Sequence, residues 1–321
     1  MSSSRSGIYR ALATEQPHPT LRDLDLQRPL DLIRRINRED RRVAPAVGRE
    51  AGRLARAVEI VSSALRAGGK LIFVGAGTSG RLGVLEAAEC PPTFGTPPRM
   101  IQAVMAGGDR CVFRSKEGAE DDAQDGARRV LRRVRAGDVV VGIAASGVTP
   151  FVRGALRAAR RRGCRTVLVT SDAWPGIGDA EVVISPRVGP EVLAGSTRLK
   201  SGTAAKMVLN LLTTVSMVRL GKVYDRWMVD LRPTSRKLRL RAVRIVSDLG
   251  GVSPAAAQGL LRDCGGSVKL AIVVARLFAR RGSSRRRPRA AQIRRAREIL
   301  AVAQGSLRRA LKSAAWEDSS R

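Results

Sequence analysis

The sequence predicts an α/β fold: a three-layer αβα sandwich with a five-stranded parallel sheet, followed by a small C-terminal helical domain. Two observations carry this prediction. Short apolar runs alternate with segments of helical periodicity, as in parallel sheets. The runs lie near residues 71–74, 100–105, 139–144, 166–170 and 181–185. From about residue 234 only helical patterns follow, which indicates a separate, smaller domain.

The length of 321 residues is enough for one full α/β core and a satellite domain. We therefore divide the chain into an N-terminal arm with a helix (1–45), an α/β domain (46–233) and a helical C-terminal domain (234–321). Helices are expected over 29–37 and 49–65, because apolar residues recur there on one face.

The chain is strongly basic, with 59 Lys and Arg against 28 Asp and Glu and a formal net charge of +31. Such a charge predicts non-specific attraction to anions at low salt. Aromatic residues make up only 3%, which leaves few stacking platforms for single strands. An Arg-rich segment, 280–297, is either a nucleic-acid patch or a solvated linker, and we favour the linker and no specific nucleic-acid partner.

The thiols and the single histidine give no sign of a metal site. His18 lies between two prolines without a partner nearby in sequence, which makes it a poor candidate for a base or a ligand. The cysteines lack C-x-x-C spacing and are expected to be buried, reduced thiols of a cytoplasmic protein. They are Cys90, Cys111, Cys164 and Cys264. Neither a signal peptide nor a membrane span is expected.

A glycine-rich turn follows the first apolar run. It contains Gly77, Thr78 and Ser79, and a helix is expected to begin near Arg81. Glycines let an anion approach the backbone, and a helix N-terminus favours a phosphate. The G-x-G-x-x-G spacing also allows a dinucleotide, but the next strand lacks the acidic residue that would bind the ribose. We favour a sugar phosphate over a dinucleotide or an empty tight turn.

Two further turns carry hydroxyls at expected helix starts. Ser146 and Thr149 precede Pro150 after the third apolar run, where they could bind a phosphate or sugar hydroxyl, or cap the helix. The segment 189–206 offers a similar group before a long apolar helix, suited to an anion or to capping. Its candidate residues are Glu191, Ser196, Thr197, Arg198, Lys200 and Thr203.

Two acidic positions are candidates for proton transfer. Glu89 precedes Pro91 and Pro92, which are expected to end the helix and leave Glu89 near its C-terminus, where the dipole would raise its pKa. Glu120 belongs to the cluster EGAEDD, whose crowded carboxylates raise one another's pKa. The alternatives are a solvated surface glutamate and an acidic helix start.

The motifs GAGTSGRLGVLEAAECPPTFG, EGAEDD, DVVVGIAASGVTPFV and GPEVLAGSTRLKSGTAAKMVLNLLTT together resemble the N-acetylmuramic acid 6-phosphate etherases, of the sugar isomerase (SIS) superfamily. The resemblance implies a SIS fold and a carbon–oxygen lyase of amino-sugar catabolism, with Glu89 and Glu120 as its catalytic pair. We assign Glu89 as the acid and Glu120 as the base. No metal or redox cofactor is required for that chemistry. Two positions depart from the family pattern: Val148 stands where Arg is usual, and Glu86 where Asp is usual.

The geometry of the expected helix indicates how the chain assembles. Because Glu89 lies well over about 10 Å along its helix from Thr78, we expect a homodimer with a shared active site and the apolar helix 207–218 near the interface. A non-catalytic sugar-phosphate-binding regulator is the alternative, but it could dispense with both glutamates. A sugar-phosphate isomerase would share the hydroxyl turns but not the stretches around Glu89 and Glu120.

Overall fold

The computed structural model describes residues 10–172, 178–278 and 290–319, and divides the chain into two compact units. Unit 1 comprises Met1–Ala88 and Pro98–Ser216, and unit 2 comprises Glu89–Pro97 and Met217–Arg321. The predicted boundary at residue 234 therefore falls inside unit 2, and the three predicted domains stay a prediction.

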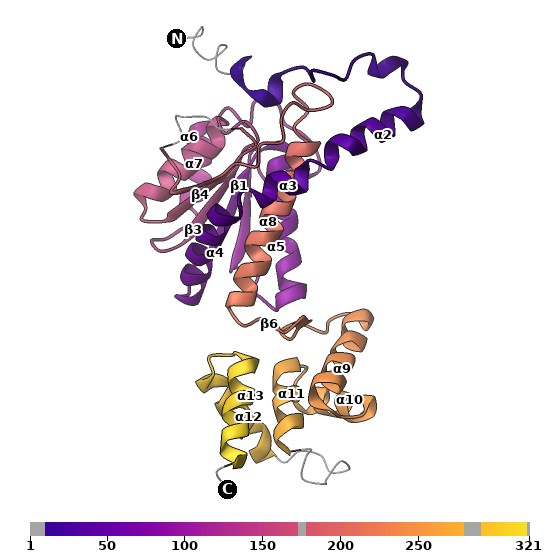
Figure 1. The fold of residues 1–321 in the computed structure, drawn as a ribbon. Coiled ribbons are helices and arrows are strands. Elements are labelled where there is room, and N and C mark those ends of the chain that lie inside the picture. The colour runs from indigo at the N-terminus through magenta and orange to yellow at the C-terminus, as the bar shows by residue number, and fades with distance from the viewer. Residues whose placement is uncertain (1–9, 173–177, 279–289, 320–321) are drawn as a thin grey trace. The chain divides into compact units, whose positions relative to one another are not determined.

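A five-stranded parallel sheet forms the centre of unit 1, as predicted (Figure 1). Its strands are paired in the order β2-β1-β3-β4-β5, and every pair is parallel. They span Leu71–Gly75 (β1), Ile101–Met105 (β2), Val139–Ile143 (β3), Arg165–Val169 (β4) and Val182–Ile184 (β5). β1 and β3 are buried along their whole lengths, which explains their uninterrupted apolar sequences.

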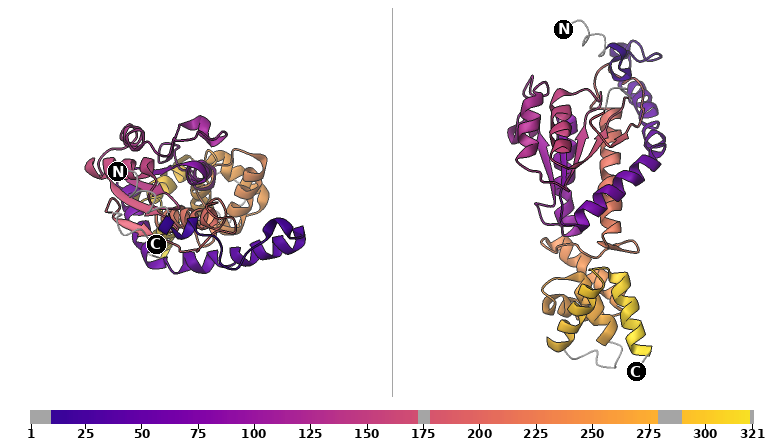
Figure 2. Two further views of the ribbon diagram at one scale, coloured as in Figure 1. Left: turned by 90° about the horizontal axis from the view of Figure 1, so that it is seen from above. Right: turned by 90° about the vertical axis from the view of Figure 1, so that its left-hand side faces the viewer.

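Helices cover both faces of this sheet, which confirms the predicted sandwich (Figures 1 and 2). On one face, α6 and α7 pack against side chains such as Ile72 and Val140. On the other, α5 approaches Phe73 and Ile143 so closely that Gly83 leaves no room for a side chain. The helices of unit 1 are α2 (Pro29–Asp40), α3 (Val43–Gly48), α4 (Ala51–Arg66), α5 (Gly77–Phe94), α6 (Ala123–Leu131), α7 (Pro150–Arg161) and α8 (Lys200–Arg219), the last turns of α5 and α8 belonging to unit 2.

Among its described residues, unit 1 also contains three short 3₁₀ helices: Ala13–Glu15, Leu24–Leu26 and Asp109–Val112. The first of them ties the N-terminal arm to loops at the sheet. The Ala13 N–H donates to Asp172 at 2.6 Å, and the Gly195 N–H donates to the Thr14 carbonyl at 3.0 Å. The arm is thus fixed to the segment that leads into α8.

The described residues of unit 2 form helices and a two-stranded antiparallel hairpin, β6 (Val223–Tyr224) and β7 (Trp227–Met228). Its helices are α9 (Arg236–Gly250), α10 (Pro254–Asp263), α11 (Val268–Phe278), α12 (Ala290–Val302) and α13 (Leu307–Ser319). The Ser253 side chain caps α10 by accepting from the Ala256 N–H at 3.3 Å, with Pro254 at the first helical position, as predicted. The first part of the Arg-rich segment 280–297 lies outside the described residues, and the rest begins α12.

Two predicted ends of α5 are wrong. The helix begins at Gly77 and not near Arg81, because Gly77 takes a φ of 52° and turns the chain directly into the helix. It also runs through Pro91 and Pro92 to Phe94. Gly95, with φ 64°, ends it by donating its N–H to the Pro91 carbonyl at 3.0 Å, an αL cap. Glu89 therefore lies inside the helix and not at its C-terminus.

No helix among the described residues is long and apolar enough to cross a membrane.

Candidate functional site

The turn between β1 and α5 brings two hydroxyls and several free backbone donors to the carboxyl edge of the sheet. Thr78 and Ser79 occupy the first turn of the helix, and both are partly exposed. The N–H groups of Gly77, Thr78 and Ser79 have no backbone acceptor among the described residues, whereas the Gly80 N–H reaches the Ala76 carbonyl at 3.1 Å. Free N–H groups at the start of a long helix form a site for an anion.

Two glycines make this turn possible by allowing backbone segments to touch. A Cβ on Gly75 would lie 2.6 Å from the Gly80 nitrogen, and a Cβ on Gly80 would lie 2.3 Å from Met105 Sδ. Both distances are far inside van der Waals contact. The helix start is therefore held close against the ends of β1 and β2.

Gly80→Ala is expected to destabilise unit 1 by about 1–3 kcal/mol, since the added methyl overpacks the contact with Met105 and the Gly75 carbonyl. Thermal denaturation would measure this loss. Gly52→Ala, in α4 with nothing within 4 Å of the added methyl, is the matched control and is expected to stabilise slightly. Equal melting temperatures for Gly80→Ala and the wild type would contradict the close approach.

The beginning of α8 lies beside the beginning of α5. A Cβ on Gly202 would be 3.5 Å from Cγ2 of Thr78, so these two helix starts are in contact range. Ser196 and Thr197 belong to the turns leading into α8, and both are partly exposed. The structure thus brings together two of the hydroxyl-bearing segments that are far apart in the sequence.

The anion at the α8 N-terminus is the chain's own Glu191. Its carboxylate is fully buried and accepts the N–H groups of Lys200 at 3.0 Å and Ser201 at 2.9 Å. This arrangement caps the helix and engages both oxygens of Glu191. Direct contact of Glu191 with a substrate stays a prediction, and its observed contacts give it a positioning role.

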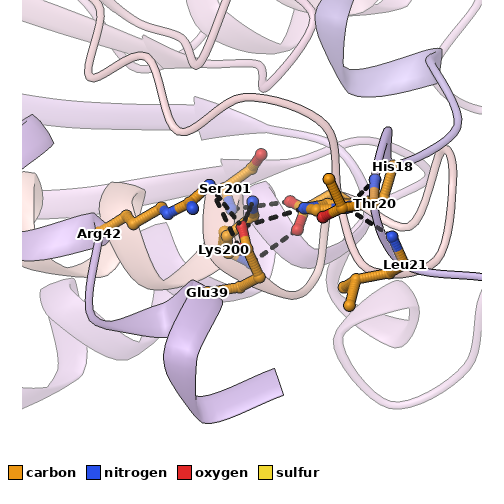
Figure 3. A network of polar contacts seen from close by, with 8 residues as sticks. His18, Thr20, Leu21, Glu39, Arg42, Lys200 and Ser201 are labelled. Carbon is orange, nitrogen blue, oxygen red and sulfur yellow. Dashed lines mark hydrogen bonds and ion pairs between the residues drawn. The ribbon is translucent and has the colours of Figure 1, made fainter. Parts of the chain in front are cut away.

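Lys200 also turns inward, into a buried network with the N-terminal arm (Figure 3). Its ammonium group is 1% exposed and lies 2.8 Å from Oε2 of Glu39, which is 4% exposed. His18 Nε2 is 3.2 Å from the same oxygen, while His18 Nδ1 accepts from the backbone N–H groups of Thr20 and Leu21. No sequence pattern indicates these partners of His18 and Lys200, because Glu39 is distant from both along the chain.

The turn after β3 and the acidic cluster meet at the start of α7. The Phe151 N–H donates to the Glu120 carbonyl at 2.9 Å, which holds the EGAEDD segment beside the Ser146–Thr149 turn. Thr149 is the N-cap residue of α7, yet its side chain forms no capping hydrogen bond. Ser146 Oγ accepts only the Val148 N–H, at 3.3 Å, among the described residues.

The two candidate catalytic carboxylates are both exposed. Glu120 belongs to unit 1 and Glu89 to unit 2. Neither side chain forms a hydrogen bond or ion pair with another described residue, so both are available to a ligand. The described residues also contain no cluster of three or more His, Cys, Asp or Glu that could hold a metal ion.

Glu86, which stands where the family usually has Asp, lies one turn before Glu89, and its side chain contacts α8. Its carboxylate accepts from Asn210 Nδ2 at 2.5 Å and from the Thr213 hydroxyl, and the side chain is buried. Glu86 therefore joins the two helices, and its extra methylene is taken up by that contact.

The chain is similar to known proteins along most of its length. Residues 53–160 match the family described as the glucokinase regulatory protein N-terminal SIS domain. An N-acetylmuramic acid 6-phosphate etherase of Symbiobacterium thermophilum is 54% identical over 252 residues, which cover 78% of this chain and 84% of the relative. One of Gloeothece citriformis is 45% identical over 311 residues, which cover 96% and 97%.

Among solved structures, a phosphoheptose isomerase from Francisella tularensis superposes with a TM-score of 0.46 at 18% identity, over 60% of this chain and all of that one. The two etherases are far more similar, and both match along most of their length. The chain belongs to the N-acetylmuramic acid 6-phosphate etherase family.

Proposed function

We propose that this protein is a carbon–oxygen lyase that converts N-acetylmuramic acid 6-phosphate to N-acetylglucosamine 6-phosphate and D-lactate. The observation that carries the proposal is the 54% identity to an etherase over most of both chains. Glu89 and Glu120, both exposed and without internal partners in the described chain, supply the two carboxylates that the chemistry needs. We assign the protein to the bacterial cytoplasm, because its relatives are bacterial and its four cysteines are buried and free.

The reaction is an elimination followed by addition of water. Glu120 takes the proton from C2, beside the C1 aldehyde of the open sugar, and the C2–C3 double bond forms as the C3–O bond to lactate breaks. Glu89 gives a proton to the departing lactate oxygen. Glu89 then takes a proton from water as the water oxygen bonds to C3, and Glu120 returns a proton to C2, so that both carboxyl groups regain their starting states.

The phosphate is assigned to the start of α5. The N–H groups of Gly77, Thr78 and Ser79 and the two hydroxyls form the anion site, and the neighbouring turn supplies Ser196 and Thr197. Ser146 and Thr149, held next to Glu120, are assigned to the sugar. In this proposal Glu191 and Lys200 fix the start of α8 beside Thr78 and do not carry the ligand themselves.

Release of D-lactate from N-acetylmuramic acid 6-phosphate by the purified protein tests the proposal. Lactate formed together with an equal amount of N-acetylglucosamine 6-phosphate is the expected result. Binding of the substrate without any lactate would contradict it and would favour a sugar-phosphate-binding regulator, with Val148 as the first position to restore to arginine.

We further propose a homodimer in which each active site uses both chains. Leu85 on α5 and Leu211 and Val215 on α8 are exposed apolar side chains of unit 1. The two helices are joined through Glu86, so these residues offer an apolar surface for a second copy. Thr78 and Glu89 lie roughly 16 Å apart along α5, since each residue adds about 1.5 Å, which favours a site shared between subunits.

Mixing two inactive variants tests the shared site. Chains with Thr78→Val and chains with Glu89→Ala, allowed to exchange subunits, should recover about a quarter of wild-type activity, because half of the dimers then hold one intact site. The control mixes Thr78→Val with the double variant, which cannot form an intact shared site. No recovery in the first mixture, with exchange demonstrated, would rule out the composite site.

A further inference from the structure

A basic cavity lies at the sheet edge formed by β5. Its volume is about 260 Å³, and its lining includes Arg49, Glu50, Arg53, Ser185 and Arg187. Ser185 directly follows β5, so the cavity is at the carboxyl edge of the sheet, like the turn around Thr78. Because β3 and β4 stand between β1 and β5, the two places are separated by three strand spacings, about 14 Å.

The charges that line this cavity are not balanced by the residues that the structure describes. Both oxygens of Glu50 lie 3.0 Å from Nη1 of Arg53, and one of them also accepts the Ser185 N–H at 3.1 Å. Glu50 is therefore fully engaged and compensates Arg53. Arg49 and Arg187 are exposed, and their side chains form no hydrogen bond or ion pair with another described residue, which leaves two unpaired guanidinium groups.

Two polar features beside these arginines also lack a partner. The hydroxyl oxygen of Ser185 is buried and has no hydrogen-bond partner among the described residues, which is uncommon for a buried polar atom. The second feature is the start of the 16-residue helix α4, which lies at the cavity. Glu50 is the N-cap residue of this helix, but its side chain does not accept a hydrogen bond from the first N–H groups. The first N–H groups of this helix thus add a positive partial charge on the same side.

We propose that this cavity binds the phosphate group of a small molecule, separately from the turn around Thr78. Guanidinium groups hold phosphate oxygens in paired hydrogen bonds, and the Ser185 hydroxyl supplies a donor. The volume is below that of pockets for drug-sized ligands, so it accommodates a phosphate with a few further atoms. The inference does not rest on the proposed etherase activity, because none of the lining residues belongs to the site assigned to that reaction.

Calorimetric titration with inorganic phosphate, at a salt concentration high enough to screen the general charge of the chain, tests the proposal. The wild type is expected to bind phosphate in the cavity in addition to the turn around Thr78. Arg49→Gln with Arg187→Gln should lose one equivalent of bound phosphate, and Ser185→Ala should weaken that same site several-fold. Circular dichroism and melting curves identify any variant that fails to fold.

The matched control is Arg132→Gln with Arg157→Gln, two exposed arginines without partners among the described residues, which removes the same charge elsewhere. It should bind as the wild type does. Equal losses in both double variants would show a non-specific charge effect and overturn the site, as would an unchanged isotherm for the cavity variant. A second titration with glucose 6-phosphate identifies the source: if it fills the variant-sensitive site, that site takes organic phosphates, and if only inorganic phosphate does so, it takes the free ion.

Discussion

Replacing Glu89 by glutamine is expected to lower kcat for lactate release by about 10²–10⁴-fold, the usual contribution of a general acid or base. Glutamine keeps the size of the side chain but cannot give a proton to the departing lactate oxygen or take one from water. Because Glu89 is exposed and has no partner among the described residues, the fold should be unaffected. KM should change little, since the phosphate is held elsewhere.

Steady-state lactate release at several substrate concentrations separates these two parameters. Glu59→Gln, an exposed carboxylate on α4 that belongs to no proposed site, is the control and should leave both parameters unchanged. A Glu89→Gln enzyme with wild-type kcat would remove Glu89 from the mechanism. A large rise in KM with unchanged kcat would give it a role in binding instead.

Glu39→Gln is expected to destabilise unit 1 by about 3–5 kcal/mol, the cost of leaving one member of a buried ion pair without its counterion. The Lys200 ammonium has no other ion pair or hydrogen bond within the described part of the chain. Urea unfolding at neutral pH measures the loss. Asp31→Asn makes the same chemical change on the same helix, in an exposed pair with Arg28, and should cost at most about 1 kcal/mol.

The difference between the wild type and Glu39→Gln should depend on pH. Burial raises the pKa of Glu39, but hydrogen bonds from Lys200 and His18 and the nearby cations outweigh it, so this pKa lies below its ordinary value of 4.5. A carboxyl whose pKa is lowered by folding stabilises the protein above its unfolded pKa and loses that contribution as the pH falls through the folded pKa. The difference should thus be constant near neutrality and shrink below about pH 4.5; a constant difference down to pH 3 would show that the carboxylate charge is not responsible.

The parts of the fold that follow from local sequence could be predicted. The five strands are short apolar runs, buried because helices cover both faces of the sheet, and their positions agree with the prediction to within a residue or two. The change from strand to helix around Gly77–Ser79 is also predicted from its glycines and hydroxyls, although these residues already form the first turn of α5, and their contact with a ligand stays a prediction. Family resemblance, and not local chemistry, singled out Glu89 and Glu120.

The errors arose where distant contacts decide the outcome. Pro91 and Pro92 are predicted to end α5, but the helix runs through them to Phe94, and Gly95, packed against the Asp230 carbonyl, supplies the cap. The internal partners of Glu191 and Lys200 are also not indicated by the sequence, whose composition there is that of an anion site, and contact of either residue with a ligand stays a prediction. Lys200 is paired with Glu39, 161 residues away, and no pattern in a single sequence marks such a pair.

The division of the chain has a consequence for how this protein can be shortened or recombined. Glu89–Pro97 belongs to unit 2, although the chain on both sides of it belongs to unit 1. Within unit 2, a Cβ on Gly95 would lie 2.2 Å from the Asp230 carbonyl oxygen, so this short segment is packed tightly against the later part of the chain. A protein truncated after residue 216 would therefore lose the residues against which the segment carrying Glu89 packs. The C-terminal helices therefore cannot be exchanged for another domain without disturbing Glu89–Pro97. We expect insertions, fusions and deletions to be tolerated after the last helix and not near residue 217, where the two units join.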